Sequence, residues 1–201
     1  MGQGLQHRLK NSTTRCRLAL LVVVPCFVVG SGCFHPAQAL GQTRIEKLKA
    51  VYLFNFGNYI DWPAAVVPAG TPPPPFVVGI VGQTHPIQLV INRIGSKKMI
   101  KGRRIKSIMI GDIAAERKCH VIFIPKDTPA KVVGQIVART RNRPVLVVGE
   151  MNGFVAADGP GMINFRLVEK QLKFDLNQRI LNKAGLKASS KLISLANLLI
   201  K

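Results

Sequence analysis

Four short apolar runs rich in β-branched residues constrain the fold of this chain more than any other feature. They occupy residues 76–82, 105–110, 121–124 and 145–148. Continuous runs of this length suit strands that are buried on both faces of a sheet. Helical stretches at 85–95 and 129–141 lie between runs, the second with Thr128 as its cap and Pro129 in its first turn. This alternation predicts an α/β fold, a three-layer αβα Rossmann-like sandwich on a mainly parallel sheet.

The last quarter of the chain follows a different pattern. Residues 162–167 and 170–176 flank a two-residue turn and predict an antiparallel C-terminal hairpin at one edge of the sheet. Ser189 and Ser190 are expected to cap a closing helix over residues 191–200. The inward stripe of that helix is predicted to be Leu192, Leu195, Ala196 and Leu199.

A long apolar helix is predicted over residues 44–61, because the stretch is free of proline until Trp62-Pro63 ends it. Aromatic and aliphatic side chains occupy all of its faces, so it should be buried on more than one side. We expect it to pack on the sheet and also on the last helix or a second subunit. A stiff proline-rich connector follows at residues 68–75.

The N-terminal segment has the pattern of an export signal. Basic residues without any acidic residue precede an uncharged run at 18–29, and a small-residue motif ends at Ala39. The run is about a dozen residues long, against the roughly 20 that a membrane-spanning helix needs. We predict a signal peptide over 1–39 and a single periplasmic domain over 40–201. Two alternatives stay open: a lipid anchor at Cys33, which follows small residues, and a start site placed too far upstream.

A strong positive charge points to an acidic partner. The chain has 29 Lys and Arg against 9 Asp and Glu, a net charge of +20, and removal of the signal leaves +16. The densest cluster is Lys97, Lys98, Lys101, Arg103, Arg104 and Lys106, and a second group is Arg139, Arg141 and Arg143. Aromatic residues are not interleaved with these cations, and an exported protein meets little nucleic acid. The sequence therefore favours an acidic protein or an anionic membrane surface, with a solvated loop as the alternative.

No motif for catalysis, a cofactor or a metal is found in the sequence. The Gly79 and Gly82 pair lacks the spacing of a phosphate-binding loop. His85 and His120 have no carboxylate close by in sequence, and the acidic residues are scattered without a close pair. Cys119 is the one cysteine of the predicted mature chain, so an internal disulfide is excluded there, and we expect it to be a buried residue of a strand.

The mature chain resembles the YfiR family of periplasmic regulators. The resemblance rests on KLKAVYLFNFGNYIDWP at 47–63, PFVVGIVG at 75–82, KGRRI at 101–105, CHVIFIP at 119–125, PVLVVGE at 144–150, NGF at 152–154, MINF at 162–165 and AGLKASSKLISLA at 184–196. It implies a non-catalytic Rossmann-like domain. It also implies a regulator that binds the periplasmic sensory domain of an inner-membrane diguanylate cyclase and lowers cyclic di-GMP signalling. Some members of the family serve other sensors, such as histidine kinases.

One departure from the family bears on regulation. YfiR itself uses disulfides, whereas this mature chain has only Cys119, so redox control through an internal disulfide is not expected. A periplasmic small-molecule-binding module without a signalling role remains the second hypothesis, and a homodimer is a further expected assembly.

Two groups of residues are candidates for special roles. Tyr59 and Trp62, at the end of the apolar helix, are candidate contacts for a partner or a second subunit, the alternative being that Trp62 seals the edge of the core. The second group consists of polar residues in apolar surroundings: Asn55, Asn164, Ser189, Ser190 and Lys191. Since buried polar groups are mostly hydrogen-bonded within the protein, a structural role is predicted for these over ligand binding.

Overall fold

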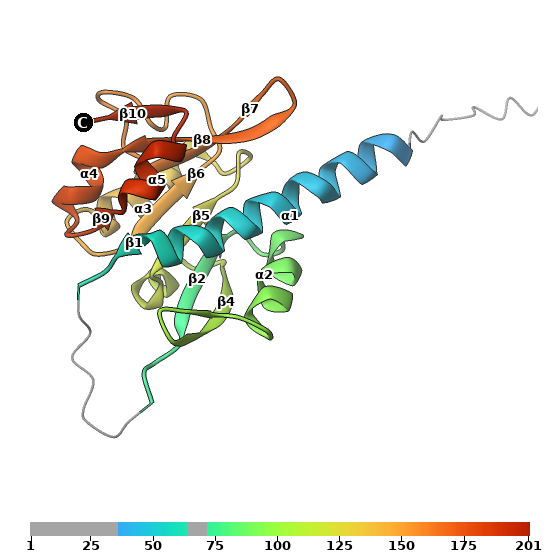
Figure 1. Ribbon diagram of the computed structural model, residues 1–201, viewed down its shortest axis with the longest axis horizontal. Helices are drawn as coiled ribbons and strands as arrows, with labels where there is room; N and C mark the ends of the chain where they lie inside the picture. The colour runs from blue at the N-terminus through green and yellow to red at the C-terminus, as the bar shows by residue number, and fades with distance from the viewer. Residues whose placement is uncertain (1–35, 64–71) are drawn as a thin grey trace, which may run out of the picture. The chain divides into compact units, whose positions relative to one another are not determined.

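The apolar runs assemble into one twisted sheet with helices on both faces (Figure 1). A computed structural model describes residues 36–63 and 72–201, and within them the sheet has eight strands in the order β10-β8-β7-β6-β5-β2-β4-β3. The strands are β2 (Phe76–Val81), β3 (Met99–Ile100), β4 (Arg103–Ile110), β5 (Val121–Ile124), β6 (Leu146–Gly149), β7 (Ile163–Val168), β8 (Gln171–Asn177) and β10 (Leu198–Ile200).

The centre of this sheet is parallel, as the sequence predicts. Strands β4, β2, β5, β6 and β7 run in one direction. Strands β7 and β8 form the predicted antiparallel hairpin, with Phe165 opposite Phe174. At the other edge, β3 pairs with β4 in the antiparallel sense.

Helices cover the two faces and complete the three predicted layers. They are α1 (Pro36–Tyr59), α2 (Ile87–Gly95), α3 (Ala130–Thr140), α4 (Gln178–Lys183) and α5 (Ser190–Leu195), with a 3₁₀ helix η1 (Ile113–Lys118). Helices α1, α2, α4 and α5 contribute to the larger apolar core, which includes Val78 and Phe123 of the sheet. Helix α3 packs on the opposite face, where Ile136 lies in a second core with Val77 and Ile122. Apolar side chains on both faces of the central strands explain why the runs have no polar alternation.

The start of α3 differs from the prediction. Pro129 occupies the cap position instead of the first turn, and no side chain caps the helix there. Thr128 therefore precedes the cap. Helix α2, by contrast, falls within the predicted residues 85–95.

The end of α1 also corrects the sequence analysis. The helix stops at Tyr59, and Ile60–Asp61 form the short strand β1, which pairs antiparallel with β9 (Lys187–Ala188). Ile60 is fully buried, so its side chain anchors this strand pair in the core. As expected of a helix that is apolar all round, α1 packs on α2 and α5 as well as on β8.

The closing helix is shorter than predicted, because the last residues form a strand. Helix α5 ends at Leu195, which is exposed instead of facing inward, and β10 follows and pairs in parallel with β8. Asn197 makes the turn possible: its backbone N–H bonds to the Phe174 carbonyl at 2.8 Å, and its side-chain amide bonds to Asp175 at 3.0 Å. The predicted hairpin is consequently not the outermost part of the sheet.

Residues 1–35 of the predicted signal peptide, Cys33 among them, lie outside the described part of the chain, as do residues 64–71 of the connector region, whereas the last four residues of the predicted peptide begin α1. Export and cleavage after Ala39 therefore stay predictions. In the described residues no helix is long and apolar enough to cross a membrane.

Candidate functional site

The strand order places a cleft at the switch point of the sheet. From β2 the chain passes through α2 to β4 on one side, and then through η1 to β5 on the other side of β2. In open α/β sheets, ligands bind beyond the carboxyl ends of the strands where the order reverses in this way. A cleft of about 570 Å³ lies at this point, among the loops that follow β2, β4, β5 and β6.

We call this hollow the switch-point cleft. Its walls are partly apolar and partly charged. The apolar lining includes Ile110, Val132, Phe165, Leu167 and Leu172, and the polar and charged lining includes Glu46, Lys49, Gln83, Thr84, His85, Lys126, Asp127, Thr128, Glu150 and Arg166. Its volume lies within the range of about 300–1,000 Å³ that is typical of small-molecule sites.

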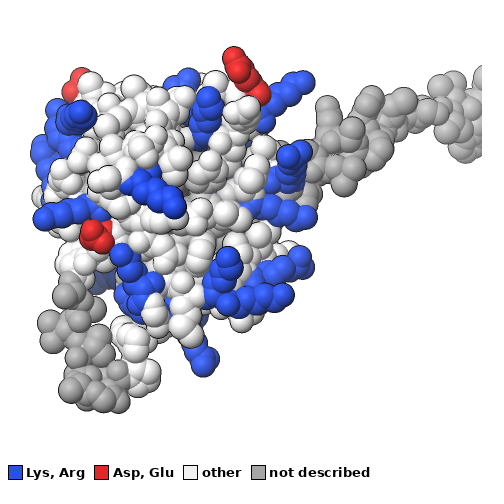
Figure 2. Space-filling view, in the orientation of Figure 1, with Lys and Arg blue, Asp and Glu red and all other residues white. Residues whose placement is uncertain are grey.

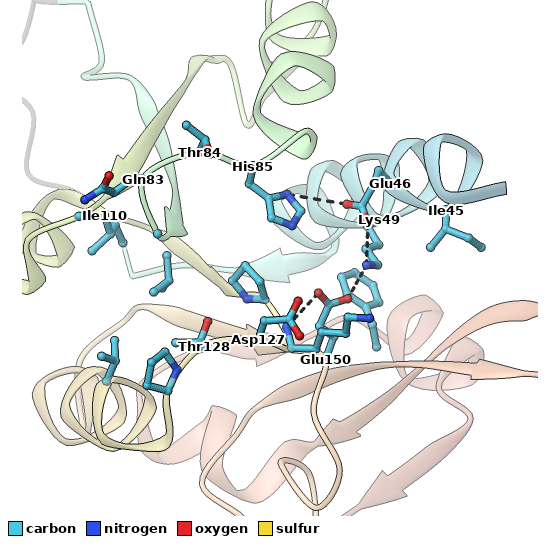
Figure 3. Close-up of a pocket in the computed structure, with 18 of the residues that line it drawn as sticks. Ile45, Glu46, Lys49, Gln83, Thr84, His85, Ile110, Asp127, Thr128 and Glu150 are labelled. Atoms are coloured by element: carbon cyan, nitrogen blue, oxygen red, sulfur yellow. Dashed lines mark hydrogen bonds and ion pairs between the residues drawn. The ribbon is translucent and has the colours of Figure 1, made fainter. Parts of the chain in front are cut away.

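Four charged or titratable side chains meet in one wall of the cleft (Figure 3). Lys49 Nζ lies 2.9 Å from Glu46 Oε1 and also forms an ion pair with Glu150. Glu46 Oε2 lies 3.8 Å from His85 Nδ1. The side chains of Glu46, Lys49 and Glu150 are only 4%, 8% and 10% exposed, so these charges are largely removed from water.

Lys49 stays protonated in this wall. Burial alone lowers the pKa of Lys49, but the hydrogen bonds and charges of Glu150 and Glu46 outweigh burial and raise it. The amine is therefore a fixed ammonium and cannot act as a nucleophile near neutral pH.

His85 stays neutral at the same pH. Burial lowers its pKa, and the neighbouring carboxylates offset this only in part. Its Nδ1 accepts a hydrogen bond from the Ile87 N–H at 3.2 Å, which fixes the ring at the start of α2.

Sequence analysis did not find this cluster. His85 was expected to have no carboxylate nearby and the acids to be scattered, whereas the fold brings Glu46 next to His85 and places Glu46 and Glu150 on one lysine. These residues come from different elements, α1, the loop before α2 and the end of β6. One signal was available: Glu46 and Lys49 are oppositely charged residues three apart in a helix whose following turns, from Ala50 on, are largely apolar.

The predicted partner residues Tyr59 and Trp62 lie at the opposite end of the parallel strands. Trp62 is half-buried, donates from Nε1 to the Gly57 carbonyl at 3.1 Å, and meets Phe76 edge-on with 5.2 Å between ring centroids. Phe76 is the first residue of β2, so this end of the sheet is the amino end of the strands.

Part of the predicted basic segment adjoins these aromatic residues. Lys101 pairs with Asp61 at 3.2 Å, and the Arg103 guanidinium lies 5.8 Å from the Phe76 ring centroid. Together with Trp62, they line a hollow of about 290 Å³. We call Tyr59, Trp62, Lys101 and Arg103 the aromatic–basic surface. The sequence pointed to each of these residues, but it did not predict that Trp62, Lys101 and Arg103 line one hollow, with Tyr59 three residues before Trp62 at the end of α1.

The remaining cations of the segment are more exposed. Lys97, Lys98, Arg104 and Lys106 are exposed to solvent, with Lys98 Nζ 5.5 Å from the Phe54 ring centroid. Arg103 differs from them: it is half-buried and donates to the carbonyls of Pro74 at 2.6 Å and Pro75 at 3.0 Å, so it holds the described end of the connector. Figure 2 shows Lys and Arg side chains spread over the visible face with few Asp or Glu between them.

Two residues of the second basic group, Arg139 and Arg143, form ion pairs with a buried carboxylate. Arg139 Nε and Arg143 Nη1 contact the two oxygens of Glu116 at 3.1 and 2.8 Å, while Arg141 is exposed. Burial raises the pKa of Glu116, but the hydrogen bonds and charges of Arg143 and Arg139 outweigh it, so the pKa is lowered.

The predicted structural polar residues are distributed over the molecule instead of bonding to one another. Asn164 is buried and accepts from the Met151 N–H at 3.1 Å. Ser189 caps α5 by accepting from the Leu192 N–H at 3.3 Å. Asn55 is only half-buried, Ser190 is the first residue of α5, and exposed Lys191 has its Nζ 5.0 Å from the Tyr59 ring centroid.

Cys119 is buried, as predicted, but it precedes β5 instead of lying in it. Burial raises the pKa of its thiol to about 12. A Cβ at Gly79 would lie 2.6 Å from its sulfur, so the glycine of β2 is required by this close approach. In residues 36–63 and 72–201, no group of three His, Cys, Asp or Glu side chains could hold a metal ion.

One known protein family matches most of the described chain. No curated protein matches the chain. Residues 46–197, from the middle of α1 to the turn before β10, match the YfiR/HmsC-like family, and this range contains the aromatic–basic surface and all of the switch-point cleft except Ile45. The chain belongs to the YfiR/HmsC-like family.

Proposed function

We propose that this protein is an exported regulator that binds the periplasmic sensory domain of an inner-membrane diguanylate cyclase and represses it, thereby lowering cyclic di-GMP signalling. The observation that carries the proposal is the family match over residues 46–197, which covers the domain from α1 to α5. YfiR-like proteins are periplasmic and regulatory, and their resemblance to this chain extends through all the motifs of the sequence.

The surface chemistry supports an acidic protein partner. Lys97, Arg104 and Lys106 are exposed. Arg104 and Lys106 lie on β4, which also carries Arg103 of the aromatic–basic surface, and Lys97 lies just before β3. Exposed cations attract an acidic partner over distances of about 8 Å at physiological salt, and aromatic side chains are frequent anchors of interfaces.

The chemistry of the two strongest nucleophile candidates supports a role in binding over catalysis. Lys49 is held as an ammonium by two carboxylates, and the Cys119 thiol is buried with a pKa of about 12. Neither group is activated as covalent catalysis requires.

The experiment is a binding measurement with a matched control. The mature protein is passed over immobilised periplasmic domains of inner-membrane diguanylate cyclases, and association is followed by biolayer interferometry at low and physiological salt. Lys97→Glu/Arg104→Glu/Lys106→Glu should slow association at least tenfold, because steering acts on the on-rate. Lys118→Glu/Lys131→Glu/Arg141→Glu makes the same change in net charge on η1 and α3 and should slow it much less.

Two outcomes would contradict this proposal. Equal slowing of association by the two triple variants would assign the slowing to net charge alone. If none of the cyclase domains binds the protein, a diguanylate cyclase is not its partner. Pull-down from membranes then distinguishes the remaining candidates, a sensor histidine kinase among them.

The other expectations have their own tests. Sedimentation with anionic vesicles tests peripheral membrane contact, and light scattering tests a homodimer. Mass spectrometry of the N-terminus separates cleavage after Ala39 from lipidation of Cys33.

A further inference from the structure

We propose that the switch-point cleft binds a small organic cation, a protonated amine carried on an apolar body. The site lies at the carboxyl ends of the strands and the aromatic–basic surface at their amino ends, so this inference is independent of the partner proposed above. It concerns Glu46, Lys49, Glu150 and the apolar wall opposite them.

The charge balance of the cleft is the first argument. In its inner wall, Glu46 and Glu150 face a single ammonium, that of Lys49, and burial keeps His85 neutral near pH 7. These groups alone leave one negative charge in a wall that is largely shielded from water. Charges in such surroundings interact much more strongly than on an exposed surface.

The other charged groups that line the cleft do not cancel this excess. Arg166 is 3.4 Å from the buried carboxylate of Asp175, which offsets its charge. Lys126 and Asp127 are both exposed at the mouth and offset each other. With the Arg166–Asp175 pair and the exposed Lys126 and Asp127 counted as neutral, the inner wall keeps its one negative charge in a chain whose net charge is +20, and a cationic ligand complements it.

The helix ends at the cleft offer an anion, the usual ligand of a switch point, fewer donors than helix N-termini usually have. Helix N-termini bind anions through free backbone N–H groups. Here α2 and α3 both have a proline at the cap position, Pro86 and Pro129, which has no N–H to donate. The next donor of α2, the Ile87 N–H, already bonds to the ring of His85.

The wall formed by the β7–β8 hairpin supplies the surface for an apolar body. Phe165 and Leu172 line the cleft from this hairpin, and Leu167 is 61% exposed beside them. A large apolar side chain exposed in the wall of a cleft is a contact surface for a ligand. An ammonium near Glu150 and an aromatic or aliphatic group against this wall would satisfy both parts of the site.

The test uses three probes that differ in charge but hardly in shape: 2-phenylethylammonium, 2-phenylethanol and 3-phenylpropanoate. Each is titrated into the mature protein by isothermal calorimetry. The ammonium probe should bind in the millimolar range or better, and the neutral and anionic probes at least tenfold more weakly. Glu150→Gln keeps the acceptor for the Lys126 backbone N–H and removes the charge, so it should weaken the ammonium probe at least tenfold.

Matched variants keep the test decisive. Asp158→Asn removes one exposed negative charge outside the cleft and should leave affinity unchanged. If Glu150→Gln does not fold, Asp127→Asn at the exposed mouth replaces it, with an expected loss of two- to threefold. The proposal is overturned if no probe binds, if the three probes bind equally, or if the folded cleft variant binds the ammonium probe as tightly as the parent protein. Binding of the cyclase domain by the same variant should be unchanged, which separates this failure from that of the proposed function.

Discussion

Acidification should destabilise this domain through His120, and the effect can be worked out from its surroundings. The ring lies at the amino end of the strands, stacked on Phe76 with 4.7 Å between ring centroids and edge-on to Trp62 at 6.2 Å. Its Nδ1 accepts from the Val77 N–H at 3.1 Å, a bond that requires that nitrogen to be unprotonated. Burial and the charge of Arg103 lower the pKa of His120 to about 4.

The direction of the change in stability with pH follows from the lowered pKa of His120. The unfolded chain takes up a proton on this histidine near its ordinary pKa of 6.5, whereas the folded protein resists protonation until about pH 4. The stability that the neutral ring contributes is therefore complete above pH 6.5 and is lost as pH falls toward 4. Linkage between these two pKa values gives a loss of at most about 2 kcal/mol between pH 7.5 and pH 5, and at most about 3 kcal/mol by pH 4, because solvent that reaches the partly buried ring screens part of the effect.

The measurement is the free energy of unfolding in urea at several pH values for the parent protein and His120→Asn. Asparagine offers an acceptor to the Val77 N–H but does not titrate, so the variant should be less stable at pH 7.5 and lose up to about 2 kcal/mol less on going to pH 5. His85 is present in both proteins, so its contribution cancels in the comparison. Parallel pH profiles for the two proteins would refute the assignment to His120.

Three further predictions concern buried or half-buried groups. Glu116→Gln should destabilise the fold by about 1–3 kcal/mol, because charge-assisted bonds to two arginines are lost. The parent protein should lose this stabilisation as pH falls below 4.5 through the lowered pKa of Glu116, and the variant should not; urea titrations at several pH values check both. The Cys119 thiol should react with Ellman's reagent at pH 8 at least about a hundredfold more slowly in the folded than in the unfolded protein. Trp62→Ala should weaken cyclase binding at least about tenfold if the aromatic–basic surface is the interface, with melting temperature measured on the same preparation; a loss of 3–5 kcal/mol in stability, as is roughly expected for a large core truncation, would instead make it a core residue.

The parallel centre of the fold was predictable because its signals are local. Each buried strand is a continuous apolar run, and helices α2 and α3 fall close to the predicted stretches. The predicted ends of the first and the last helix were wrong for a different reason. Strands β1 and β10 are three residues or fewer, and they exist because of partners far along the chain, β9 and β8. A run such as 198–200 has no periodicity long enough to distinguish a helix from a strand.

The switch-point cleft was not predictable for a related reason. Glu46 and Lys49 are neighbours on one helix, but Glu150 is distant in sequence, and only the position of α1 across the ends of the strands brings it to Lys49. Spacing motifs detect sites whose ligands lie on one loop or helix. A site assembled from α1, a β2–α2 loop and the end of β6 leaves no such spacing.

The distribution of the acidic residues makes the surface more basic than the composition suggests. Of the nine acids, Glu46, Glu116 and Asp175 are buried and Glu150 is nearly so. They form ion pairs with Lys49, Arg139, Arg143 and Arg166, and the five other acids are exposed: Asp61, Asp112, Asp127, Asp158 and Glu169.

Cations that are paired with buried acids contribute less to the field around the protein, since the opposite charges partly cancel at a distance. Glu116 offsets one of the two charges of Arg139 and Arg143, so the steering charge comes mainly from exposed cations such as Lys97, Arg104 and Lys106. This is why the charge reversal designed for the cyclase test leaves the arginines around Glu116 untouched. Reversing those arginines would unbalance a buried carboxylate, and the resulting loss of stability would be mistaken for a loss of binding.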